Sequence, residues 1–119
     1  MLKVGIIGVG TVGASVANIL RDNKNIITAR AGIEIVPVLG VVSNLHKARN
    51  VDIKLTNNID DVLNDDSIDV VVELMGGIDK PNEIVRKALL KGKAVVTANK
   101  ALLAYHRYEL QELAGDIPF

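Results

Sequence analysis

Hydrophobic and polar positions follow two patterns that alternate along the chain, one typical of buried strands and one of helices that lie against a sheet. Short runs rich in Val and Ile predict strands at residues 2–8, 33–42, 54–57, 68–74 and 94–97. Wider apolar spacing predicts helices at residues 14–21, 60–63, 81–91 and 101–114. Residues 21–32 stay ambiguous, because Asn23–Asn25 interrupt a helical pattern that residues 26–30 resume before Gly32.

This alternation predicts the fold class, an α/β domain with a doubly wound parallel sheet and helices on both faces. The chain has 119 residues and no internal repeat or low-complexity linker, which predicts a single domain over residues 1–119. In such sheets a ligand crevice lies beyond the carboxyl ends of the strands, at the point where the strand order reverses. We therefore expect the crevice at the ends of the strands 2–8 and 68–74.

The first predicted strand runs directly into a glycine-rich turn with the spacing G-x-G-x-x-G. A strand before this spacing and a helix after it form the context that predicts a dinucleotide-binding Rossmann domain. Gly8 permits the tight turn, Gly10 lets the backbone approach a pyrophosphate, and Gly13 allows helix and strand to pack closely. A tight turn without a nucleotide is the alternative. The candidate binding residues are Gly8, Val9, Gly10, Thr11, Val12 and Gly13.

Composition narrows the class of protein further. The 14 basic and 14 acidic side chains leave a net charge of zero, so nothing in the charge balance favours nucleic acid or an anionic membrane as a partner. No apolar run approaches the roughly 18 residues that a membrane span needs, and the start of the chain leads straight into a strand. We therefore expect a cytoplasmic protein. The absence of cysteine and the two separated histidines lead us to expect no metal site.

The end of the second predicted strand lacks the acidic residue that reads the ribose in NAD-selective folds, roughly 20 residues after the glycines. Glu34 has that spacing but stands where the strand begins, so we interpret it as a charge at the strand entry. Ser43, Asn44 and Lys47 follow the end of the strand instead. Hydroxyl, amide and basic groups suit a ribose 2′-phosphate, so we expect NADP in preference to NAD. Two alternatives stay open: the protein uses both dinucleotides, or Lys47 is a solvent-exposed loop residue without a role in binding.

A second glycine turn lies on the same edge of the predicted sheet, where Gly76 and Gly77 follow the strand 68–74. A turn without side chains would let the nicotinamide half of a dinucleotide lie against backbone; a plain strand-ending turn is the alternative. We interpret Glu73 as a structural carboxylate or a contact to substrate rather than a catalytic base, although the pattern does not decide among these roles.

Polar residues close the last predicted strand on this edge too, with Thr97 at its end and then Asn99 and Lys100. A lysine in an apolar crevice can bind a phosphate or carboxylate, polarise a carbonyl or donate a proton. The alternatives are structural, an Asn99 that caps the following helix and a Lys100 that merely begins it.

Three blocks of this sequence resemble the N-terminal domain of homoserine dehydrogenase, and the likeness spans essentially the whole chain. They are V-G-I-I-G-V-G-T-V-G at residues 4–13, D-V-V-V-E-L-M-G-G at 69–77 and G-K-A-V-V-T-A-N-K-A-L-L-A at 92–104. The third block is the most specific, because many dehydrogenases share the glycine hexad. The family reduces aspartate 4-semialdehyde to homoserine with NADPH or NADH, towards threonine, methionine and isoleucine.

The resemblance implies roles position by position. Gly8 through Gly13 would hold the pyrophosphate, and Ser43 with its basic neighbours would meet the adenosine ribose. Lys100 would be a catalytic lysine near the reacting carbon. Many members place an arginine directly after the second strand, where this chain has Ser43 and Asn44, so a strict NADP preference does not follow. The residues expected on the nicotinamide side are Gly76, Gly77, Thr97 and Asn99.

The family also carries a substrate-binding and dimerising region after this domain, so the resemblance implies a cofactor domain that does not turn over substrate alone. The full-length enzyme would be a homodimer that binds aspartate 4-semialdehyde and homoserine. Two other functions stay open: a nucleotide-sensing regulatory module, and the cofactor domain of another semialdehyde or amino-acid dehydrogenase.

Overall fold

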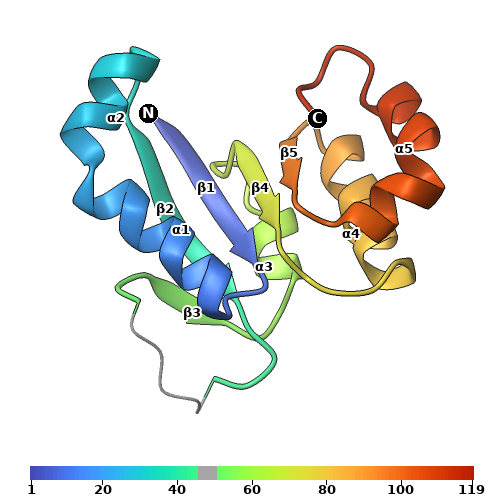
Figure 1. Ribbon diagram of the computed structural model, residues 1–119, viewed down its shortest axis with the longest axis horizontal. Helices are drawn as coiled ribbons and strands as arrows, with labels where there is room; N and C mark the ends of the chain where they lie inside the picture. Colours follow the sequence, from blue (N-terminus) through green and yellow to red (C-terminus); the bar gives the residue numbers. More distant parts are fainter. Residues whose placement is uncertain (46–50) are drawn as a thin grey trace.

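The computed structural model describes residues 1–45 and 51–119, so Lys47 lies outside the described residues. Strands and helices alternate along the chain as the hydrophobic pattern predicts (Figure 1). The elements are β1 (Leu2–Ile7), α1 (Thr11–Asp22), α2 (Lys24–Ala31), β2 (Ile35–Val41), β3 (Lys54–Thr56), α3 (Asp60–Leu63), β4 (Val70–Glu73), α4 (Asp79–Leu90), β5 (Ala94–Thr97) and α5 (Lys100–Ala114).

The strands form one five-stranded sheet in the order β3-β2-β1-β4-β5, and every neighbouring pair is parallel. The order reverses between β1 and β4, because the chain adds β2 and β3 on one side of β1 and then crosses to the other. The predicted doubly wound sheet and its reversal point are therefore confirmed. All carboxyl ends of the strands lie on one edge, which we call the carboxyl edge.

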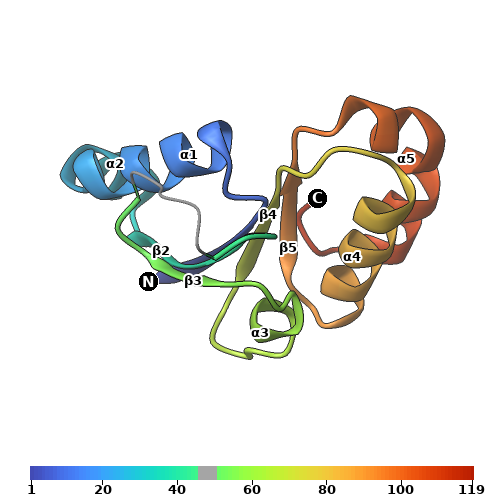
Figure 2. The same ribbon diagram turned by 90° about the horizontal axis from the view of Figure 1, so that it is seen from below.

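Two hydrophobic cores lie on opposite faces of the sheet. Figure 2 shows α1 and α2 over one face and α4 and α5 over the other, with α3 near the end of β3. The larger core packs the sheet against α3, α4 and α5, and includes Ile7, Val71, Leu89 and Leu102. The smaller core lies under α1 and contains Val4, Ile6, Val9, Ala17 and Val42. In residues 1–45 and 51–119, no helix has the length and apolar character that crossing a membrane requires.

The ambiguous stretch before β2 forms a separate helix, α2, which ends at Gly32 in a left-handed conformation with φ of 74°. Pro37 lies inside β2, opposite Val4 of β1, and the register of the two strands shifts at the next residue of β1. A proline has no N–H to donate to the ladder, so an irregularity at this position is expected. α1 begins three residues earlier than the predicted helix, directly at the glycine turn.

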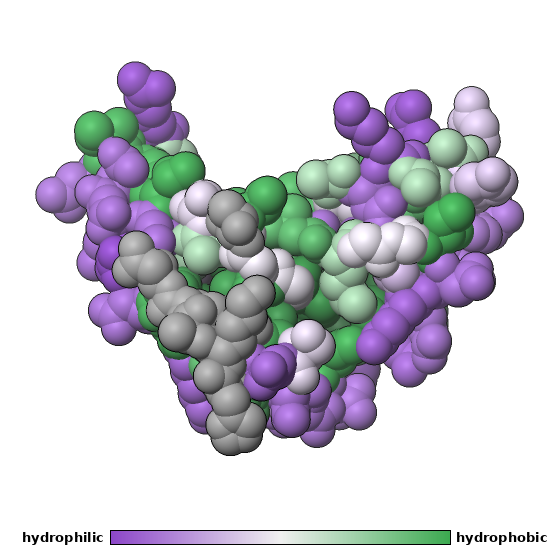
Figure 3. All heavy atoms as spheres, turned by 60° about the horizontal axis from the view of Figure 1, so that its bottom comes forward, coloured by the Kyte–Doolittle hydropathy of each residue, from purple (hydrophilic) through white to green (hydrophobic). Residues whose placement is uncertain are grey.

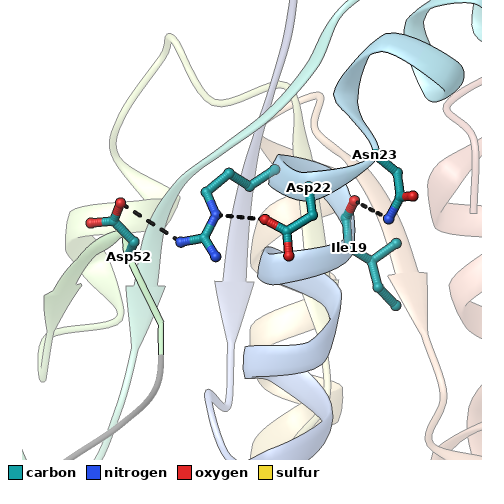
Figure 4. A network of polar contacts seen from close by, with 5 residues as sticks. Ile19, Asp22, Asn23 and Asp52 are labelled. Carbon is teal, nitrogen blue, oxygen red and sulfur yellow. Dashed lines mark hydrogen bonds and ion pairs between the residues drawn. The ribbon is translucent and has the colours of Figure 1, made fainter.

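Ion pairs and a hydrogen bond lie at the C-terminal end of α1, far from the carboxyl edge (Figure 4). The Arg21 guanidinium lies 3.1 Å from a carboxylate oxygen of Asp22 and 3.7 Å from one of Asp52, and Asn23 donates to the carbonyl of Ile19. These groups are largely exposed, so each ion pair contributes little to stability. The contacts help to orient α1 rather than to hold the fold together.

A buried lysine closes the opposite, amino edge of the sheet. Lys93 is only 4% exposed, and its ammonium donates to the carbonyls of Asp65 (2.6 Å) and Ile68 (2.8 Å). The pKa of the Asp65 carboxyl is lowered mainly by a hydrogen bond from the Ser67 hydroxyl and also by one from the Ser67 backbone N–H. The charge of Lys93 lowers this pKa further. Lys93 thereby fixes the turn that leads into β4.

We predict that Lys93→Met destabilises the fold by about 2 kcal/mol, because the buried carbonyl of Ile68 and the partly buried carbonyl of Asp65 lose a charged donor. The matched control is Lys91→Met, since Lys91 is exposed and two residues away. Urea unfolding followed by circular dichroism measures both free energies. Equal stability of the two variants would show that the buried ammonium does not hold this turn.

Candidate functional site

A pocket of about 430 Å³ lies at the carboxyl edge, at the point where the strand order reverses. Its size falls in the range of small-molecule sites. Figure 3 shows the molecule with this edge turned forward: apolar surface gathers in the hollowed centre, and hydrophilic side chains dominate the projections on either side. The pocket is lined by Ile7, Gly8, Val9, Gly10, Val41, Val42, Ser43, Asn44, Asn57, Ile59, Leu74, Met75, Gly76 and Lys80.

The turn at Gly8 lies between the ends of β2 and β4. Its N–H donates to the carbonyl of Val41 over 3.0 Å, and its φ of 97° is a conformation that favours glycine. A Cβ at this position would lie 3.0 Å from the backbone carbon of Leu74. Gly8 therefore allows three backbone segments to meet at the reversal point, as the glycine spacing predicts.

Two further glycines, Gly13 and Gly40, allow neighbouring groups to pack closely around the turn at Gly8. A Cβ on Gly13 would lie 2.6 Å from the carbonyl oxygen of Gly8, so α1 can approach β1 only because Gly13 has no side chain. A Cβ on Gly40 would lie 2.6 Å from a methyl group of Val9. The Val9 side chain is thus buried against β2 and serves the core. Among the predicted binding residues, Val9 offers a ligand its backbone only.

Gly10 differs from these glycines, because a Cβ there would meet no atom within 4 Å. Gly10 is also the N-cap of α1 and has no side chain with which to cap the helix start, and no residue of the first turn is acidic. The first N–H groups of a helix have no partner inside the helix, and its start carries a partial positive charge. The open space over Gly10 and this uncapped helix start together fit the pyrophosphate of a dinucleotide.

The other side of the pocket carries the polar residues that follow β2. Ser43 and Asn44 line it as predicted, and no acidic residue is among the described lining residues. Asn57 and Lys80 also line it, and sequence reasoning did not name them. Both follow the rule that predicts the site, since Asn57 comes directly after β3 and Lys80 lies in the first turn of α4. Lys80 is the one charged side chain among these described lining residues.

A buried carboxylate organises the neighbouring end of β4. Glu73 is 0% exposed; one of its oxygens accepts from the N–H of Met75 (2.8 Å), and the other accepts from the Thr97 hydroxyl (2.6 Å). The Thr97 oxygen in turn accepts from the N–H of Asn99 over 3.0 Å. Glu73 lies opposite Thr97 in the register of β4 and β5, which places the two side chains together. Of the roles left open for Glu73, these hydrogen bonds show the structural one.

Asn99 joins this arrangement to both the glycine turn and α5. Its amide nitrogen donates to the carbonyls of Gly77 (2.7 Å) and Met75 (3.3 Å), and its oxygen accepts from the N–H of Leu102 at 3.0 Å. The capping role proposed for Asn99 is therefore confirmed. We call Glu73, Thr97 and Asn99 the Glu73 network.

The structure does not bring every predicted site residue into the pocket. Gly76 lines it, whereas Gly77, Thr97 and Asn99 are not among its lining residues. The side chains of Thr97 and Asn99 make hydrogen bonds within the protein. Their predicted contact with nicotinamide stays a prediction. Lys100 is exposed at the first position of α5, and Thr11, Val12 and Gly13 follow Gly10 into α1.

A second pocket, of about 250 Å³, lies at the amino edge between α1 and β2. Its charged groups pair with one another, Lys24 with Glu34 at 2.8 Å and Arg21 with Asp52. Glu34 precedes β2, which confirms its placement at the strand entry. In the described part of the chain, no group of three or more His, Cys, Asp or Glu side chains is arranged to hold a metal ion.

Comparison with known proteins identifies the family. Residues 8–116 match the family model described as the NAD binding domain of homoserine dehydrogenase. The chain belongs to this family. It is 45% identical over 117 residues to the homoserine dehydrogenase of Helicobacter pylori, covering 98% of this chain and 28% of that protein. It is also 45% identical to the Pseudomonas aeruginosa enzyme over 111 residues, covering 92% and 25%.

Solved structures agree with this family. A homoserine dehydrogenase from Thiobacillus denitrificans superposes with a TM-score of 0.90 at 45% identity, over 95% of this chain and 27% of that one. A levoglucosan dehydrogenase in complex with NADH and L-sorbose superposes with a TM-score of 0.78 at 19% identity, which shows a shared fold alone. This chain spans about a quarter of the length of the curated relatives it matches. The family match supports a nicotinamide dinucleotide as the cofactor.

Proposed function

We propose that this chain is the cofactor-binding part of a homoserine dehydrogenase, which interconverts homoserine and aspartate 4-semialdehyde. The observation that carries the proposal is the pocket at the reversal point, where the uncapped start of α1 and the open space over Gly10 suit a pyrophosphate. When bound, the nicotinamide supplies the hydride that reduces the semialdehyde. The reaction belongs to the synthesis of threonine, methionine and isoleucine, and we propose a homodimer for the full-length enzyme.

In this proposal the pyrophosphate lies at Gly10, and the two halves of the dinucleotide extend from it in opposite directions. The adenosine half lies towards Ser43, Asn44 and Asn57, and the nicotinamide half lies towards Met75 and Gly76. The Gly76–Gly77 turn suits a flat ring, because a Cβ on either glycine would meet nothing within 4 Å. The residues of the first helical turn, Thr11, Val12 and Gly13, donate their N–H groups to the pyrophosphate.

We propose NADP as the preferred cofactor, with use of NAD also possible in this pocket. No carboxylate among the described lining residues would repel a 2′-phosphate, and Ser43 and Asn44 offer it hydrogen bonds. Lys80 adds the one cation in the described lining, and Lys47 is a further candidate that lies outside the described residues.

We propose Lys100 as a catalytic residue for the carbonyl of the semialdehyde. It follows Asn99, whose side chain holds the glycine turn, so its backbone is fixed beside the nicotinamide half. A cation there would stabilise negative charge that develops on the substrate oxygen during hydride transfer. A nucleotide-sensing module and a different semialdehyde dehydrogenase are not favoured by the family match.

Titration calorimetry of the 119-residue chain with NADPH tests the proposed cofactor site. We expect saturable binding at one site, and at least about tenfold weaker binding by Gly10→Ser, because serine fills the open space and competes for the helix N–H groups. Serine is a favourable N-cap, so this variant should change the free energy of unfolding by less than about 1 kcal/mol. Undiminished binding by a folded Gly10→Ser chain would contradict the assignment of the pyrophosphate.

A second titration tests the preference between the two dinucleotides. Ser43→Asp places a carboxylate beside the expected 2′-phosphate, so we predict that the ratio of NADP to NAD affinity falls by about tenfold. Asn25→Asp on α2 changes the charge in the same direction at an exposed site far from the pocket, and serves as the control. An unchanged ratio for Ser43→Asp would remove Ser43 from the adenosine end of the site.

A further inference from the structure

The Gly76–Gly77 turn is exposed and has no side chains of its own to pack against the protein. A Cβ at either glycine would meet nothing within 4 Å, and both glycines are exposed. Glycine loses more backbone entropy on ordering than other residues, so this turn needs another source of order. In the described part of the chain, the hydrogen bonds that reach the backbone of Met75–Gly77 come from Glu73 and Asn99.

Burying the Glu73 carboxylate costs free energy, and the hydrogen bonds that it accepts offset that cost. A carboxylate with 0% exposure is expensive to bury, and among the described residues Glu73 has no cationic partner within ion-pair distance. It is compensated by donors from two places, the N–H of Met75 and the hydroxyl of Thr97. The carboxylate thus connects the pocket wall to the end of β5.

The same arrangement of a threonine hydroxyl between a carboxylate and a backbone N–H occurs at a second strand end, which has no glycine turn beside it. At the end of β3 the Thr56 hydroxyl donates to Asp61, and the Thr56 oxygen accepts from the N–H of Asn58 over 3.1 Å. Thr97 and Asn99 repeat this pattern at the end of β5. Only the β5 copy is joined by a side-chain amide to the turn beside the pocket, through Asn99.

We propose that the Glu73 network is a positioning device that sets the Met75–Gly77 turn for the nicotinamide half of the dinucleotide. Glu73 orients Thr97, Thr97 holds the backbone of Asn99, and the Asn99 amide fixes the carbonyls of Met75 and Gly77. Because Asn99 also caps α5, the same network fixes the backbone position of Lys100 relative to that turn. None of the three side chains needs to touch the ligand. This inference rests on the proposed function, since it assigns the turn to the nicotinamide half.

The test compares two ligands that differ only in the ring. The 119-residue chain is titrated with NADPH and with 2′-phospho-ADP-ribose, which lacks the nicotinamide. Thr97→Val keeps the shape of the side chain but removes the hydroxyl that links Glu73 to Asn99. We expect it to weaken NADPH binding by about tenfold and to change the affinity for 2′-phospho-ADP-ribose by less than about twofold. Thr97→Ser keeps the hydroxyl and should restore the wild-type ratio.

The matched control is Thr56→Val, which breaks the sister motif at β3. It should lower the melting temperature to a similar extent, yet leave the ratio of the two affinities unchanged, because both ligands contain adenosine. If Thr97→Val does not fold, Asn99→Ser takes its place, since serine still caps α5 but has no amide to hold the turn. The same selective loss of NADPH binding is expected from this variant.

The outcomes separate the two proposals. Equal losses for both ligands, no loss for either, or the same ratio in Thr97→Val and Thr56→Val would overturn the positioning role while leaving the cofactor site intact. Failure of the wild-type chain to bind either ligand would instead refute the proposed function itself.

Discussion

The close approach of three backbone segments at Gly8 is the constraint on which the rest of the structure depends. The end of β1 passes between β2 and β4, and a side chain at Gly8 would crowd the backbone of Leu74, 3.0 Å from its Cβ. A positive φ at Gly8 then turns the chain into α1 so that the helix start faces the carboxyl edge. Two other glycines make room around this turn. Gly13 lets α1 pack against the carbonyl of Gly8, and Gly40 leaves space for the side chain of Val9.

In our proposals, the residues around this constraint divide into those that bind the dinucleotide and those that position the binding residues. The pocket itself presents backbone, apolar side chains, a few neutral polar groups and Lys80. The side chains of the Glu73 network are not among the lining residues, and they make their hydrogen bonds to other groups of the protein. Such a division would preorganise the site, because the groups proposed to fix its shape already have partners within the protein.

The sequence predicts the parallel sheet, the point where its strand order reverses and the edge at which we propose the site, because these follow from strand periodicity, parallel crossovers and one glycine spacing. It does not predict where side chains point. That Thr97 faces Glu73 depends on the register of β4 and β5, and that Val9 packs over Gly40 depends on a contact between positions far apart in sequence. Asn57 and Lys80 could have been named from the edge rule, although only the structure shows that they line the pocket.

The most direct test of the dinucleotide site is a titration of the ¹⁵N-labelled chain with NADP⁺, followed by amide chemical shifts. Our account predicts saturable shifts at Gly8–Gly13, at Ser43 and Asn44 and at Leu74–Gly77, with the amino edge around Lys93 unaffected. Shifts confined to the amino-edge pocket between Lys24 and Asp52, or no saturable shifts at the glycine turn, would contradict it.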